Sequence, residues 1–208
     1  MEEMGTVGSR LSGLALLASI VLLASSCREA PTAISMGGFA IDPHPEVRFL
    51  SIEMHPGLVK FTTTYNFFGD GRVQIDRFHT SGAGGSLESH TVRLTKEEQW
   101  RLMVDFLEGG LFTLDPKELQ ARDLVEGRAR PSVADAGSFA VSIALVQRRW
   151  GGLGPRKVVR HRFAMGGSAL ALPFVSAAPD TREHEALRRL MELVRRVQAR
   201  AAESETPS

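Results

Sequence analysis

Apolar and polar residues alternate along segments 59–67 and 72–78, which is the pattern of half-buried β-strands. A Gly-Asp-Gly sequence separates the two segments. If all three residues form the loop, with Gly71 in the left-handed conformation, Phe67 pairs with Val73 and the apolar residues of both strands share one face. We therefore predict a β-hairpin with a three-residue turn.

A second alternating pair follows at 139–145 and 156–165. His161 falls on the apolar side of the later segment, so we expect a histidine at the edge of the core with a hydrogen-bonded ring. Arg160 and Arg162 alternate with that side and should point outward. These segments predict a second hairpin.

Helical spacing begins after a shorter predicted strand at 90–95. Thr95 and Glu98 have the spacing of a capping box, which predicts a helix over 96–108 that ends at Gly109. We expect its apolar stripe to consist of Trp100, Met103, Val104 and Leu107. A short helical turn is predicted at 115–118, where Asp-Pro begins the segment.

The last helix is predicted over about 181–202, with Asp180 and Glu183 as its cap. One side of this helix collects Leu187, Leu190, Met191, Val194 and Val197. The order of the elements predicts an α+β fold, an antiparallel sheet of two hairpin–helix units with both helices packed on one face.

The amino-terminal run 11–24 is apolar but shorter than the roughly 20 residues that span a bilayer, and it has the length of a secretion signal. Small residues then lead to Cys27, the single cysteine of the chain. This arrangement resembles the lipobox of bacterial lipoproteins. The resemblance implies that the signal is removed before Cys27 and that the cysteine is acylated. Export without a lipid and a buried amino-terminal helix are the alternatives.

The resemblance divides the chain into a signal peptide at 1–26, a Pro- and Gly-rich tether at 27–45, an α+β domain at 46–203 and a frayed tail at 204–208. It also implies a lipid-anchored protein that faces the periplasm, at the outer membrane rather than the inner one. The element order over 57–197 further resembles small envelope lipoprotein domains of unknown function, for which no activity is assigned. A single cysteine excludes an internal disulfide.

The residues give no pattern of a catalytic, metal or cofactor site. The glycine-rich stretches lack the context of a phosphate loop, and no G-x-S-x-G sequence is present. The six histidines lack metal-ligand spacing. His79 and His90 could face each other across a hairpin and form a weak site with Asp76, although solvated histidines are the simpler interpretation.

The net charge is only +1, yet no acidic residue occurs between 138 and 179. The basic residues of this stretch are Arg148, Arg149, Arg156, Lys157, Arg160 and Arg162. They predict an anion-binding surface, with a solvated or internally paired sheet face as the alternative.

We therefore expect a non-enzymatic binding or assembly module of the envelope. Its partners would be the membrane, through lipid on Cys27, and an anionic envelope lipid or another envelope protein, but no nucleic acid. The alternatives are a small periplasmic hydrolase and a periplasmic inhibitor that presents the hairpin tip Trp150-Gly151-Gly152 to its target.

Overall fold

The computed structural model describes residues 33–55, 61–79, 85–119, 137–147, 157–166 and 181–205. The chain divides into two units, 1–32 and 33–208, and all described residues belong to the second. Residues 33–208 form a compact unit of their own, and the buried core of the described residues lies within it. The predicted signal peptide and Cys27 lie outside the described residues.

The fold is α+β, with an antiparallel sheet, as the alternating segments predict. The strands are β1 (Ser35–Met36), β2 (Phe39–Ala40), β3 (Arg48–His55), β4 (Phe61–Phe68), β5 (Arg72–His79), β6 (Ser86–Arg93), β7 (Ser138–Gln147) and β8 (Lys157–Gly166). The six long strands lie in the order β8-β7-β3-β4-β5-β6. The short β1–β2 hairpin pairs with the same edge of β7 as β3 does, but beyond the end of β3. There Phe39 pairs with Gln147.

The first predicted hairpin is confirmed as β4 and β5. Phe67 pairs with Val73, and Gly71 has a φ of 86°. The Gly71 backbone N–H donates to the Phe68 carbonyl at 2.9 Å and closes the turn. The next strand, β6, begins at Ser86, four residues before the predicted strand, because it pairs with the whole length of β5.

The second predicted hairpin is confirmed as β7 and β8. Val141 pairs with Phe163, and Ile143 pairs with His161, so the apolar residues of both strands share one face. The His161 ring lies with Nε2 3.0 Å from the carbonyl oxygen of Leu114. This contact confirms the predicted hydrogen-bonded histidine at the edge of the core.

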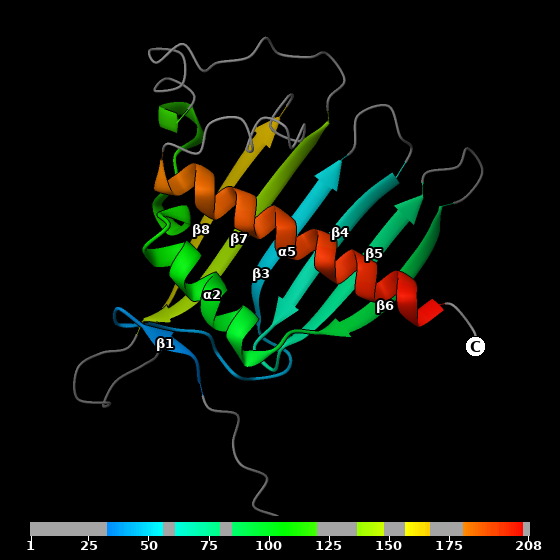
Figure 1. Ribbon diagram of the computed structural model, residues 1–208, viewed down its shortest axis with the longest axis horizontal. Helices are drawn as coiled ribbons and strands as arrows, with labels where there is room; N and C mark the ends of the chain where they lie inside the picture. Colours follow the sequence, from blue (N-terminus) through cyan, green and yellow to red (C-terminus); the bar gives the residue numbers. More distant parts are fainter. Residues whose placement is uncertain are drawn as a thin grey trace, which may run out of the picture. The chain divides into compact units, whose positions relative to one another are not determined.

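The helices are α2 (Lys96–Leu107) and α5 (Arg182–Glu205), with a 3-10 turn, η1, at Leu111–Thr113. Figure 1 shows that α2 and α5 cross the same face of the sheet. The predicted apolar side of α5 is confirmed, because all five of its residues are buried. Gln198 of α5 also reaches the sheet and donates a hydrogen bond to the hydroxyl of Tyr65.

The predicted apolar stripe of α2 is wrong in part. Trp100 is 45% exposed, whereas the buried residues of this helix are Gln99, Leu102, Met103, Asp105 and Phe106. The side of α2 that faces the core differs from the predicted one because Asp105 is buried, where it pairs with Arg189 of α5 at 2.7 Å. A polar residue can therefore take a buried position.

The caps agree with the sequence prediction at one helix end only. Thr95 and Glu98 form the predicted capping box of α2. The left-handed residue after this helix is Gly110, not Gly109. The predicted cap of α5, Asp180, lies outside the described residues, and the Thr181 hydroxyl accepts from the backbone N–H of His184 at 3.3 Å.

Residues 33–45, expected to be part of a tether, are packed against the domain. Ile41 is only 1% exposed, and the rings of Phe39 and Phe112 lie 5.4 Å apart. These apolar contacts and the pairing of β2 with β7 fix the segment, which Pro and Gly content alone did not indicate. Residues 27–32 lie outside the described residues.

Candidate functional site

The candidate site lies on the face of the sheet that α2 and α5 leave uncovered (Figure 1). Side chains alternate between the two faces, so the residues between the core positions of each strand gather there. We call this surface the open face. Across its middle, β7 contributes small residues, Ala140, Ser142 and Ala144, each partly exposed.

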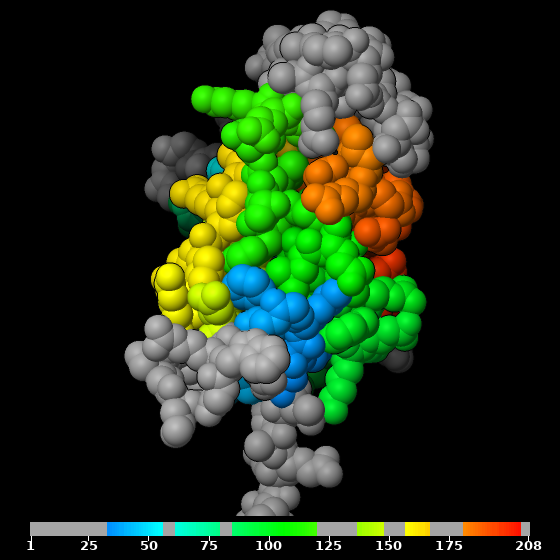
Figure 2. All heavy atoms as spheres, turned by 90° about the vertical axis from the view of Figure 1, so that its left-hand side faces the viewer, coloured from blue at the N-terminus to red at the C-terminus, as the bar shows by residue number. Residues whose placement is uncertain are grey.

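Arg160 and Arg162 lie on the open face, opposite Ala144 and Ser142 of β7. Both arginines are exposed, as predicted. Among the described residues, no carboxylate lies within ion-pair distance of either guanidinium. Figure 2 views the molecule from the side of β8, an edge strand of the sheet, and shows β8, in yellow, at the surface.

The remaining predicted anion-binding residues are placed in part. Lys157 is exposed at the first position of β8. Arg148, Arg149 and Arg156 lie outside the described residues, as does the tip Trp150-Gly151-Gly152 of the inhibitor hypothesis.

A hydrogen-bonded ladder of polar side chains crosses β3 to β6 on the open face. The Asp76 carboxylate accepts from Ser89 Oγ at 2.7 Å and from Gln74 Nε2 at 2.9 Å. The carbonyl of Asn66 accepts from Arg48 Nη1 at 2.8 Å and from Ser51 Oγ at 3.1 Å. Because these groups satisfy one another, the ladder offers a rigid polar floor rather than a reactive group.

Three further arginines were missed by the sequence reasoning, which counted charges along one stretch only. Arg48, Arg72 and Arg93 come from β3, β5 and β6, at the end of the sheet where β8 begins. Arg72 and Arg93 are direct cross-strand partners. The strand register, once it is known, is the signal that brings them together.

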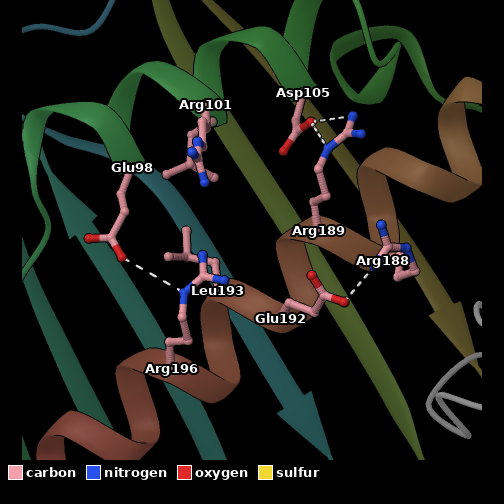
Figure 3. A pocket seen from close by; sticks show the side chains of 9 residues that line it. Glu98, Arg101, Asp105, Arg188, Arg189, Glu192, Leu193 and Arg196 are labelled. Carbon is pink, nitrogen blue, oxygen red and sulfur yellow. Dashed lines mark hydrogen bonds and ion pairs between the residues drawn. The ribbon is translucent and has the colours of Figure 1, made fainter.

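A second concave region, the interhelical groove, lies between α2 and α5 and has a volume of about 170 Å³. Figure 3 shows its arginine and carboxylate side chains facing one another across the two helices. Asp105 pairs with Arg189 at 2.7 Å, and Glu98 pairs with Arg200 at 2.7 Å.

Each arginine at this groove has a carboxylate partner. The pairs are Arg101 with Glu97, Arg188 with Glu185 and Glu192, Arg189 with Asp105 and Glu185, and Arg196 and Arg200 with Glu98. Five arginines thus face five carboxylates, and the groove has no excess charge to attract an anion. These arginine–carboxylate pairs join the two helices, and we call them the interhelical seam.

The two buried carboxylates of the seam differ in electrostatics. Burial raises the pKa of Glu98, but hydrogen bonds from the Arg200 guanidinium and the Thr95 backbone N–H lower it by more, so this pKa is below its ordinary value. For Asp105, burial raises the pKa by more than the Arg189 guanidinium lowers it. Glu98 is therefore stabilised as an anion by the fold, whereas Asp105 is not.

The hypothetical metal site of His79, His90 and Asp76 is wrong. Asp76 lies on the open face with Ser89, whereas His90 pairs with Ile75 on the opposite face. His79 pairs with Ser86, four residues along the strand from His90. Among the residues that the structure describes, no group of three or more metal-ligating side chains gathers at one point.

The comparisons leave the chain without a relative to argue from, because no protein-family model and no curated protein matches it. Within the described part of the chain, no helix is long and apolar enough to cross a membrane.

Proposed function

We propose that this protein is a non-enzymatic binding module of the bacterial cell envelope, anchored through lipid on Cys27, whose open face binds an anionic partner. The observation that carries the proposal is the contrast between two sets of arginines. Those of the interhelical seam are paired with carboxylates, whereas Arg160 and Arg162 are exposed on β8 without one among the described residues.

The unpaired arginines favour an anion because each basic residue near an anionic surface contributes about 1 kcal/mol of binding free energy. The hydrogen-bonded floor beside them supports contact with an extended surface rather than enclosure of a small substrate. An anionic lipid or an acidic envelope protein meets these requirements.

The first experiment uses the chain from Ala33 to Ser208 and inorganic polyphosphate as the anionic probe. We expect Arg160→Glu with Arg162→Glu to weaken binding at least about thirtyfold, the equivalent of two lost contacts of about 1 kcal/mol each. The matched control is Lys96→Glu with Arg195→Glu, which changes the net charge equally on exposed helix positions. Equal weakening by both double variants would mean that only net charge matters, and it would overturn the proposal.

The anchor has a separate test. The intact mass of the native product should correspond to a chain that begins at Cys27 and carries acyl groups. An unprocessed amino terminus recovered from cytosol contradicts the anchor.

We also infer that the domain is organised as two hairpin–helix units, with β4 and β5 preceding α2 and β7 and β8 preceding α5 in the chain. The support is that an antiparallel hairpin precedes each helix in the chain, with β6 between the β4–β5 hairpin and α2. Native-state hydrogen exchange should then show two groups of amides with distinct opening free energies. A single opening free energy for all core amides contradicts this organisation.

A further inference from the structure

One end of the open face carries five arginines on four different strands. Arg48 begins β3, Arg72 begins β5 and Arg93 ends β6, whereas Arg160 and Arg162 are the fourth and sixth of the ten residues of β8. Because the strands are antiparallel, the first three positions fall at the same end of the sheet, and the β8 pair extends from that end to the middle of its strand. We call this set, Arg48, Arg72, Arg93, Arg160 and Arg162, the arginine end.

The pairing of Arg72 with Arg93 is the least expected feature of the arginine end. Like charges placed directly opposite each other in a sheet are destabilising. Arg72 is held by the Pro45 carbonyl at 2.6 Å and stacks on Phe68 at 4.3 Å. Arg93 is exposed, and no carboxylate of the described residues lies within ion-pair distance of it. Such a pair is stabilised when an anion approaches both guanidinium groups.

The carboxylates at this end do not neutralise it. Asp70 lies 3.9 Å from Arg72, and Asp42 and Glu46 occur in the segment that leads into β3. Arg48 and Arg93 pair with none of these carboxylates among the described residues, and exposed Lys157 adds a further positive charge on β8.

The spacing of the arginines indicates the size of the occupant. From β8 to β6 there are five strand-to-strand steps, which at about 4.8 Å each span about 24 Å. One small anion cannot contact both edges of this surface. The occupant has to present negative charge over the width of the sheet, as the headgroups of an anionic bilayer do.

The position of the chain entry favours the bilayer. The described chain enters through the β1–β2 hairpin, and Ala40 pairs with Val146 near the start of β8, so the entry lies at the arginine end (Figure 1). Five residues lie between Cys27 and Ala33, and the six residue-to-residue steps span at most about 20 Å. A lipid on Cys27 therefore keeps this end of the domain close to the membrane that holds it.

We propose that the arginine end docks on the anionic phospholipid surface of that membrane, with the strands pointing away from it. The inference rests on the proposed function, since it names the anionic partner and uses the lipid anchor. Each basic residue near an anionic surface strengthens binding about fivefold, so several arginines together give a stable orientation of the anchored domain.

The experiment measures partition of the chain from Ala33 to Ser208 onto vesicles, and thus does not depend on the native lipid. Vesicles of phosphatidylcholine mixed with phosphatidylglycerol are compared with vesicles of phosphatidylcholine alone. The informative variant is Arg93→Glu, which places a carboxylate opposite Arg72 and should raise thermal stability or leave it unchanged. We expect the same substitution to weaken partition onto anionic vesicles at least about fivefold, and the control Arg195→Glu to change it less than twofold.

Each result has one interpretation. Weaker partition of Arg93→Glu with undiminished stability supports docking of the arginine end. Equal partition of the unsubstituted chain onto neutral and anionic vesicles overturns it. If Arg93→Glu partitions normally while the β8 double variant loses polyphosphate binding, the membrane inference fails and the proposed anion-binding function stands. If the double variant retains polyphosphate binding as well, both fail.

Discussion

Removal of the Glu98 side chain should weaken the domain more than removal of its exposed neighbour Glu97. Glu98 is 11% exposed and accepts from the Thr95 backbone N–H at 2.9 Å and from Arg200 at 2.7 Å. Loss of a helix cap costs about 1 kcal/mol, and loss of a hydrogen bond to a charged group costs about 1.5–3 kcal/mol. Because Arg200 is 37% exposed, we take the lower end of the second figure.

We therefore expect Glu98→Ala to lower the free energy of unfolding by about 2–3 kcal/mol, measured by urea denaturation at neutral pH. For a domain of this size, the loss corresponds to a decrease in Tm of about 5–10 °C. The matched control is Glu97→Ala in the same helical turn. Glu97 is 71% exposed and pairs with Arg101 on the surface, so its loss should cost about 0–1 kcal/mol.

The pH dependence gives an independent check. The pKa of Glu98 is below its ordinary value of 4.5 in the folded state, so its charge contributes stability above that value and loses it as the pH falls through the lowered pKa. Glu98→Gln keeps an acceptor for the cap but removes the charge. It should be less stable than the unsubstituted protein at neutral pH, and the difference should disappear in acid. Equal costs for Glu98→Ala and Glu97→Ala, or a Glu98→Gln deficit that persists in acid, would refute the reasoning.

Three further outcomes follow from the packing and electrostatics. Gly69→Ala places a Cβ atom 1.5 Å from the Asp42 carbonyl oxygen, so the backbone has to move. The free energy of unfolding should therefore fall by about 1–3 kcal/mol, and an unchanged urea midpoint contradicts this. Tyr65→Phe leaves the amide of Gln198 without its acceptor in the core and should cost about 1–2 kcal/mol by the same measurement, whereas a gain in stability shows that the hydrogen bond is not needed. The pKa of Asp105 is raised by burial above its ordinary value of 3.8, so the ionised form is disfavoured in the folded state and its contribution to stability grows as the pH falls through the raised pKa. Asp105→Asn should therefore not lower the urea midpoint at neutral pH, and a loss above about 1 kcal/mol contradicts the sign of this shift.

The sheet could be predicted from the sequence because its strands carry a strong local signal. Alternation fixes which residues of a strand face the core, and the Gly-Asp-Gly turn fixes the register of its partner, so the pairing of Phe67 with Val73 followed from the chain alone. The β1–β2 hairpin has two residues in each strand, which is too short for alternation to be visible. It is held by tertiary contacts, above all the packing of Ile41 in the core.

The two helices show where periodicity fails. The buried side of α5 consists of aliphatic residues, and its spacing was sufficient to identify it. On α2, a buried carboxylate takes a core position while Trp100 is exposed. The partner of Asp105 is 84 residues away in the chain, at Arg189, so a pattern read along one helix cannot show that the carboxylate is paired.

The same distinction separates the two halves of the candidate site. Arg160 and Arg162 could be identified because they alternate with apolar residues within one strand. Arg72 and Arg93 could not, because they lie on different strands and become part of one basic surface only through the register of β5 with β6. Local charge counts therefore underestimate a surface that is built across strands. A search for the partner should use the whole arginine end rather than the basic residues of β8 alone. An anion that contacts only the β8 edge of the sheet leaves Arg72 and Arg93, which oppose each other at the other edge, without a partner.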